Sequence, residues 1–248
     1  LEDPLEAPAS AALPLRTLVA VPTTAGSGSE ATHFAVVYRQ GAKHSVAAPA
    51  IRPSHVILVP EFTGSASPFQ TACSGMDALA QGIESHWARH ATDESRRLAA
   101  QAVRLAWHNL EDAVHHPAPR NRARMQEAAH LAGRAINISK TTGAHAFSYI
   151  LTSEFGLPHG HAVALLIPHF VDYHQKAGIP LEGIHAADLF SLVEQIHLAR
   201  TLPMKAPALA RLLLENVNLE RLSNNPVPVT PEFIHSIAQD LAGKQNGA

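Results

Sequence analysis

The stretch Ser74-Gly75-Met76-Asp77-Ala78-Leu79-Ala80-Gln81 places one carboxylate among small and apolar residues of a predicted helix. Ser67-Pro68 is a suitable N-cap and first helical position, and we expect this helix to end near Ala88. The Asp77 carboxylate would point into the protein interior, where it needs a cation or several hydrogen bonds. Gln81 lies four residues later and shares the same helix face.

Two histidines further along the chain are candidate partners of Asp77. His145 lies early in a predicted helix, and His159 lies at the start of the next helix, after the break Gly156-Leu157-Pro158. A turn between the two helices can aim both imidazoles at one point. One Asp and two His form a suitable ligand set for Zn²⁺ or Fe²⁺, with a position left open for a substrate oxygen.

The spacing alone leaves other interpretations open. Asp77 can also cap a helix or pair with an Arg, and His145 can be a hydrogen-bonded core residue. His161 competes as a ligand because His-x-His is itself a metal-binding pattern, although alternate positions diverge on a helix. The chain contains 17 histidines, which lowers the value of any single one as evidence.

The rest of the chain predicts a short β-rich part followed by helices. Residues 15–22 and 55–60 are expected to form buried strands, and 34–38 with 43–47 a hairpin. Further helices are expected over 92–116, 120–138, 143–155 and 160–173, with three shorter ones beyond, broken near 202–203 and 223–226. The predicted fold is a partial α/β nucleotide-binding domain over residues 1–65 and an all-α metal-binding domain over 66–248.

Composition excludes several classes of protein. Lys and Arg total 19 against 21 Asp and Glu, a net charge of −2, so no basic field recruits nucleic acid or anionic lipid. The single cysteine, Cys73, excludes a disulfide framework and a thiolate-rich zinc site. No apolar run approaches the length of a membrane span, and the N-terminal residues lack the features of a signal peptide. We therefore expect a soluble, cytoplasmic protein.

Three segments resemble signatures of the iron-containing (group III) alcohol dehydrogenases, in the same order: residues 22–30 (PTTAGSGSE), 75–79 (GMDAL) and 158–165 (PHGHAVAL). Residues 221–226 (RLSNNP) are similar to the C-terminal region of that family. Within the family, residues 139–149 (SKTTGAHAFSY) are most similar to the phosphonoacetaldehyde reductase group. The resemblance implies the dehydroquinate synthase-like architecture, with the active site in the cleft between an N-terminal α/β domain and a C-terminal helical domain.

The resemblance also implies a ligand set. Family members usually bind the metal through an Asp, a His four residues later and two His near the later helix break. Asp77, His145 and His159 match three of these positions, whereas Gln81 stands at the fourth. An amide oxygen is a poor ligand for soft-leaning divalent metals. Either Gln81 binds weakly or through water, or the site has three protein ligands, as in glycerol dehydrogenases and dehydroquinate synthases. We favour three ligands and leave Fe²⁺ or Zn²⁺ open.

Further roles follow from the same resemblance. Tyr149 stands where many members have another His, so it is a candidate hydrogen-bond donor in catalysis, together with His161. Lys140 can supply the counter-charge for an anionic substrate, or it can be a solvated surface lysine. The loop of residues 23–30, called the cofactor loop from here on, is implied to line the NAD(P) site. Its predicted contacts are Thr23, Thr24, Gly26, Ser27 and Ser29. The family's pyrophosphate-binding glycine-rich turn lies upstream of this loop, and no such element precedes Leu15. We therefore expect the N-terminal part of the family fold to be absent and NAD(P) binding to be weak.

Three functional hypotheses result. The first is a metal-dependent, NAD(P)-linked alcohol dehydrogenase or aldehyde reductase, acting on a small alcohol or aldehyde such as an anionic phosphonoaldehyde, and forming a homodimer. The second is a metal-dependent lyase similar to dehydroquinate synthase, against which the cofactor loop argues. The third is a truncated, non-catalytic paralogue that binds metal without turnover. No nucleic-acid or membrane partner is expected for any of them.

Overall fold

The computed structural model describes residues 17–39 and 42–243. The described strands are β1 (Val19–Ala20), β2 (Phe34–Arg39), β3 (Ala42–Ala47) and β4 (His55–Val56). Short 3-10 helices lie at Ser29–Ala31, Pro49–Ile51 and Pro60–Thr63. β1 pairs in parallel with β4, and β2 pairs with β3 as an antiparallel hairpin, as predicted. The predicted turn at residues 40–41 lies outside the described residues.

The helices follow from Pro68 onward. They are α1 (Pro68–Trp87), α2 (Asp93–His115), α3 (Pro119–Ser139), α4 (Gly143–Phe155), α5 (His159–Lys176), α6 (Ala186–Gln195), α7 (Ala206–Glu215), α8 (Leu219–Ser223) and α9 (Pro231–Leu241). The five long helices fall where the sequence predicts them, but the C-terminal part holds four helices where three were expected. The chain therefore contains part of an α/β unit followed by a helical domain, and the exact division at residue 65 stays a prediction.

Two of the long helices, α1 and α2, begin at residues whose side chains cap them. The Ser67 hydroxyl accepts a hydrogen bond from the Gln70 backbone N–H at 3.1 Å, and Pro68 follows as the first helical residue. The Thr92 hydroxyl accepts from the Ser95 N–H at 3.2 Å, and Ser95 returns the bond in a capping box. Both helix starts are thus fixed by local sequence, as predicted.

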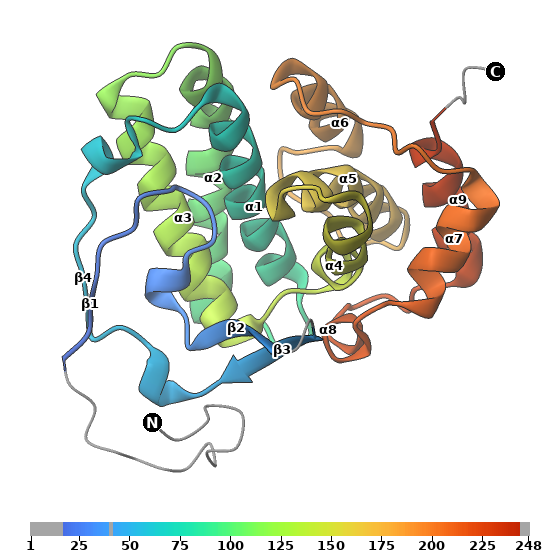
Figure 1. The fold of residues 1–248 in the computed structure, drawn as a ribbon, viewed down its shortest axis with the longest axis horizontal. Coiled ribbons are helices and arrows are strands. Elements are labelled where there is room, and N and C mark those ends of the chain that lie inside the picture. Colours follow the sequence, from blue (N-terminus) through green and yellow to red (C-terminus); the bar gives the residue numbers. More distant parts are fainter. Residues whose placement is uncertain (1–16, 40–41, 244–248) are drawn as a thin grey trace.

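Helices α1, α2 and α3 lie side by side, and α5 crosses in front of α1 with α4 alongside it (Figure 1). Small residues let these backbones approach closely, and α1 is buried along most of its length. The apolar side chains of α1 to α7 and α9 form one continuous core. Among the described helices, none is long and apolar enough to cross a membrane.

The strands of the parallel pair differ from the sequence-based expectation. Residues 15–22 and 55–60 were predicted as buried strands, but the described strands are two residues long, and Leu18, Val19 and Ile57 are about half exposed. The prediction of burial was wrong for these residues, because a two-stranded sheet cannot cover its own faces. An apolar run shows that a side chain can be buried, but not what covers it.

The cofactor loop, residues 23–30, rests on α3 (Figure 1). Gly28 has φ +59°, and a Cβ there would lie 2.5 Å from the Cα of Gly133 on α3. A Cβ at Gly133 would in turn lie 2.5 Å from the Gly28 carbonyl oxygen. The two backbones therefore touch directly. The nearby contact between Glu30 and His130, at 3.2 Å, fixes the loop further along.

Candidate metal centre

Three potential metal ligands come together from three helices. Asp77 lies near the middle of α1, His145 in the first turn of α4, and His159 is the first residue of α5. One ligand atom from each lies within 4.8 Å of the others. The Asp77 Oδ1 is 3.2 Å from the His145 Nε2 and 3.8 Å from the His159 Nε2. One ion can contact all three after small side-chain rotations.

A glycine between the helices allows this approach. A Cβ at Gly160 would lie 1.9 Å from the carbonyl oxygen of Cys73 on α1 and 3.2 Å from the Cβ of Asp77. The first turn of α5 can therefore rest directly on α1 only because position 160 has no side chain. This contact brings His159 to Asp77.

Glu84 is a site residue that the sequence analysis missed. It lies on α1, seven residues after Asp77, and is fully buried. Its Oε2 contacts the His145 Nδ1, and its Oε1 accepts hydrogen bonds from the Thr142 hydroxyl at 2.8 Å and the Ala144 N–H at 2.7 Å. A carboxylate on Nδ1 directs the Nε2 of His145 toward Asp77. The seven-residue spacing, which repeats a helix face, was the available signal.

The electrostatics of the cluster attract positive charge. Burial alone would raise the pKa of both Asp77 and Glu84, but the hydrogen bond and charge of His145 hold both below their ordinary values. Burial would lower the pKa of His145, yet the two carboxylates raise it to about 9. A site that retains a proton so firmly between two carboxylates also suits a divalent cation, which would replace that proton. The residues present therefore fit a metal.

Gln81 lies beside the triad, with 4% of its surface exposed. Its Nε2 donates to the Ser27 carbonyl oxygen at 3.2 Å, so it connects α1 to the cofactor loop. Its Oε1 is buried and lacks a hydrogen-bond partner among the described residues. Gln81 thus has a position compatible with the predicted weak ligand and a separate role in holding the loop. Direct binding of metal by Gln81 stays a prediction.

The triad opens into a cavity of about 370 Å³. Of the five predicted cofactor-binding residues, Ser27 and Ser29 line this cavity. Thr23 and Thr24 are exposed and are not among its lining residues. Gly26 is buried against α1, where a Cβ would lie 2.7 Å from the Cβ of Ser74. The loop therefore faces the metal cluster through its second half, and Gly26 acts as a packing residue.

Tyr149 forms the far wall of this cavity. Its ring stacks on the His159 ring with 5.6 Å between centroids, and burial raises the pKa of its phenol above the usual range. The Arg221 guanidinium lies 5.5 Å from the centre of the Tyr149 ring and also lines the cavity. The segment that contains Arg221 resembles the family's C-terminal region, but its sequence alone predicted no role for this residue. Nothing in local spacing links α8 to α4, because they meet only in the fold.

The structure places two predicted residues away from this cavity. Lys140 is about half exposed and pairs with Glu220 at 2.9 Å, and it does not line the cavity. The lysine ends α3 at φ +59° and faces a surface carboxylate, so its position gives no support to the predicted role as the counter-charge of a substrate, which stays a prediction. The solvated-lysine interpretation describes it better.

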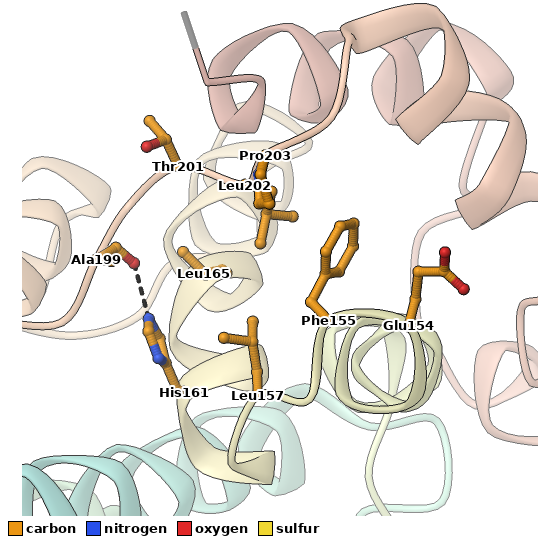
Figure 2. A pocket seen from close by; sticks show the side chains of 9 residues that line it. All are labelled: Glu154, Phe155, Leu157, His161, Leu165, Ala199, Thr201, Leu202 and Pro203. Carbon is orange, nitrogen blue, oxygen red and sulfur yellow. Dashed lines mark hydrogen bonds between the residues drawn. The ribbon is translucent and has the colours of Figure 1, made fainter. Parts of the chain in front are cut away.

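His161 is also separated from the triad, although it lies two residues after His159. Figure 2 shows it beside a different cavity of about 340 Å³, where it contacts the Ala199 carbonyl oxygen at 2.8 Å. Leu157, Leu165 and Leu202 line the same space. The structure does not bring His161 to the metal cluster, since alternate helix positions point in different directions. Its predicted catalytic role is not supported by this position.

The fold and the cluster define a class of protein that joins part of an α/β unit to a helical domain with an Asp–His–His site. Residues 71–238 match the C-terminal model of the Fe-containing alcohol dehydrogenase family, and residues 4–60 match the iron-containing alcohol dehydrogenase model. The chain belongs to the iron-containing alcohol dehydrogenase family, as the sequence resemblance predicted.

Individual relatives agree with this assignment. The chain is 42% identical to a phosphonoacetaldehyde reductase of Streptomyces viridochromogenes over 65% of its own length and 42% of that protein. It is 30% identical to a 1-propanol dehydrogenase of Salmonella typhimurium over 92% of its length and 70% of that protein. A crystal structure of sulfoacetaldehyde reductase from Bifidobacterium kashiwanohense with NAD⁺ matches with a TM-score of 0.80 and 31% identity, over 92% of this chain and 65% of that one. The chain thus spans part of the length of these relatives.

Proposed function

We propose that this protein is a metal-dependent, NAD(P)-linked alcohol dehydrogenase or aldehyde reductase. The observation that carries the proposal is that Asp77, His145 and His159 place their ligand atoms within 4.8 Å of one another and line a single cavity with Ser27 and Ser29. The proposed metal ligands and the proposed cofactor loop therefore face the same space. Family membership supports the same chemistry, and an NAD⁺ complex is known for the sulfoacetaldehyde reductase.

Asp77, His145 and His159 would hold Fe²⁺ or Zn²⁺, with Gln81 as a weak or water-mediated addition. When bound, such a metal supplies a Lewis acid that polarises a carbonyl or alcohol oxygen. Glu84 fixes the orientation of His145 and balances its charge. Ser27 and Ser29 are proposed to face the nicotinamide side of the cofactor. We keep Thr23, Thr24 and Gly26 as parts of the same loop rather than as direct contacts.

Tyr149 is proposed to act on the substrate side of the cavity. Its phenol keeps its proton at neutral pH, since the pKa of a tyrosine is ordinarily near 10 and burial raises it further, so it can donate a hydrogen bond to a substrate oxygen. The stacking on His159 fixes the ring beside the proposed metal ligands. The proposed substrates are small alcohols and aldehydes, including anionic aldehydes of the kind named for the reductase relatives. A homodimer and a cytoplasmic location stay predictions from the sequence.

The proposal can be tested on the full-length protein. It should be stripped with a chelator, reloaded with Fe²⁺ or Zn²⁺, and assayed for NADH and NADPH oxidation with propanal and phosphonoacetaldehyde. We expect aldehyde-dependent oxidation only after metal is restored, and loss of both metal and activity in Asp77→Asn. Oxidation by fully metal-free protein would overturn the proposal. Metal binding without oxidation of either cofactor would favour the non-catalytic or lyase alternatives.

A further inference from the structure

A permanent cation lies in the wall of the cavity that contains the proposed metal ligands. Arg221 belongs to the short helix α8, and its guanidinium lines the cavity together with Thr141 and Tyr149. Among the described lining residues, Asp77 is the only carboxylate and Arg221 the only arginine or lysine. Asp77 is already engaged by His145 and His159. Among the described residues that line the cavity, no carboxylate is therefore left to neutralise the charge of Arg221.

The position of Arg221 is fixed by its surroundings. The Asn218 side chain accepts a hydrogen bond from the Arg221 N–H at 3.0 Å, and the Asn218 N–H donates to the Ala146 carbonyl at 3.2 Å. Asn224, just after α8, donates to the carbonyl oxygens of Ser139 and Thr141 at 2.7 and 3.0 Å. These bonds attach the start of α8 to α4, and its end to the last residue of α3 and to the segment that follows it. The guanidinium is consequently presented to the cavity before any ligand arrives, which favours binding.

Arg221 differs from its neighbour Lys140 in the way its charge is used. Lys140 pairs with Glu220 at 2.9 Å on the surface. Within the described part of the chain, no carboxylate lies within ion-pairing distance of Arg221, whose Nη1 instead donates to the neutral Thr141 hydroxyl at 2.7 Å. Thr141 is buried, with 2% of its surface exposed. A half-buried arginine held by a hydroxyl rather than a carboxylate retains attraction for an anionic ligand.

The chemistry of the wall fits an oxyanion. A guanidinium has five N–H donors in a fixed plane that matches two oxygens of a carboxylate, phosphonate or sulfonate. The Thr141 hydroxyl accepts from Arg221 and can donate its own hydrogen to the same anion. Tyr149 connects this wall to the triad, because its ring contacts the Arg221 guanidinium and also stacks on the His159 ring. Arg221 and the proposed metal ligands therefore line the same cavity, joined by one aromatic ring.

We propose that Arg221, supported by Thr141, is the specificity-determining residue that binds the oxyanion group of a short anionic aldehyde while the carbonyl lies at the triad. This inference rests on the proposed reductase function. It replaces Lys140 with Arg221 as the residue that recognises substrate charge. Neutral aldehydes would be reduced without using this contact.

The test compares Arg221→Gln with wild type in the metal-loaded, full-length protein, using phosphonoacetaldehyde and the neutral propanal. A hydrogen-bonded charge contributes about 1.5–3 kcal/mol, so kcat/KM for phosphonoacetaldehyde should fall roughly 10- to 100-fold, mainly through KM. The value for propanal should change less than about threefold. Arg221→Lys keeps the charge without the planar fork and should fall in between. Lys140→Gln, which removes the neighbouring surface cation, is the matched control and should leave both substrates unchanged.

Ligand binding provides a readout that does not depend on turnover. Titration calorimetry with ethylphosphonate should show binding to wild type and Lys140→Gln, and its loss in Arg221→Gln. Equal losses for phosphonoacetaldehyde and propanal in Arg221→Gln, with a weaker affinity for NAD(P)H, would assign Arg221 to the cofactor and overturn the inference. So would unchanged kinetics for both aldehydes in that variant. If wild type oxidises NAD(P)H with neither aldehyde, the proposed function fails, and the ethylphosphonate titration alone then decides the role of Arg221.

Discussion

Two cavities flank the first turn of α5, and each contains a histidine of the same short motif. The cavity beside His159 includes Asp77 and His145 and receives the serines of the cofactor loop. The cavity beside His161 is lined mainly by apolar residues, and His161 there contacts a backbone carbonyl. The two spaces are similar in volume, about 370 and 340 Å³. Their chemistry differs because of what the facing elements supply, not because of size or of the histidine itself.

The difference shows what a His-x-His pattern means on a helix. Residues two positions apart project roughly 200° from each other around the axis, since each residue turns the helix by about 100°. When one of the two histidines faces the Asp77 carboxylate of α1, the other must point away from that carboxylate. The identity of the ligand was therefore decided by which histidine begins the helix, next to the glycine that contacts α1.

The largest difference should appear when each histidine is changed alone. His159→Gln should weaken metal binding roughly several hundred-fold, because a structural zinc site contributes about 10–16 kcal/mol shared among its ligands. His161→Gln should leave metal affinity within about threefold of wild type. Competition with a chromophoric chelator measures both dissociation constants. Similar losses in the two variants would show that both histidines serve one metal and that the division is wrong.

The next test closes the contact that brings His159 to Asp77. In Gly160→Ala the new Cβ would meet the Cys73 carbonyl oxygen of α1, which cannot move as a flexible side chain can. We expect a loss of about 2 kcal/mol or more in the free energy of unfolding, together with weaker metal binding. Gly156→Asn is the control: this αL position has open space around it, and Asn tolerates αL. Urea unfolding and chelator competition measure the two effects, and wild-type metal affinity in Gly160→Ala would contradict the argument.

A smaller effect is expected from the carboxylate behind His145. Glu84→Gln should reduce metal affinity about 10- to 100-fold, because the partner that orients a ligating imidazole is lost. Glu154→Gln, which changes a carboxylate lining the other cavity, should have no effect on metal. Metal content after dialysis, measured by mass spectrometry, separates the variants. If Glu84→Gln retains full affinity, His145 is oriented by the helix alone.

The smallest effect concerns the other end of α5, where His174 is buried. Burial lowers the pKa of His174 to about 4, from an ordinary value of 6.5, and its Nε2 is 3.0 Å from the Asn225 side-chain nitrogen. As the pH falls below 6.5, His174 is protonated in the unfolded chain before it is protonated in the folded protein. Its contribution to stability is therefore complete above pH 6.5 and is lost progressively between pH 6.5 and pH 4. The free energy of unfolding, measured with urea, should be lower at pH 5 than at pH 7. His174→Gln should reduce this difference by about 1 kcal/mol. An equal pH dependence of stability in wild type and His174→Gln would show that His174 does not cause the loss.

The helical part of the fold was predictable from sequence because its signals are local. Ser67-Pro68 and Thr92 cap their helices as expected, and the break before His159 separates α4 from α5. The family resemblance, added to the spacing, named Asp77, His145 and His159, which the fold brings together. Two of them lie at the start of helices, where a short break largely determines the direction of a side chain.

Other features depended on partners that a sequence does not reveal. Lys140 and Arg221 are both cations near the predicted site, and only the fold shows that Glu220 pairs with one while the other faces the cavity. The apolar residues of β1 look like a buried strand, yet their burial depends on what covers them. Glu84 was missed because the hydrogen bonds of its carboxylate come from the segment 142–145, which lies about sixty residues later in the sequence.

The contact between Gly28 and Gly133 has a consequence for how this family member can change over evolutionary time. The backbone of each glycine occupies the space that a Cβ at the other would need, so neither position can accept a side chain alone. Substituting both would place two side chains in the same small space. The backbone of the cofactor loop is therefore fixed against α3, whereas the side chains of Ser27 and Ser29, which line the cavity, take no part in that contact. New preferences can arise by exchanging those side chains on an unchanged frame.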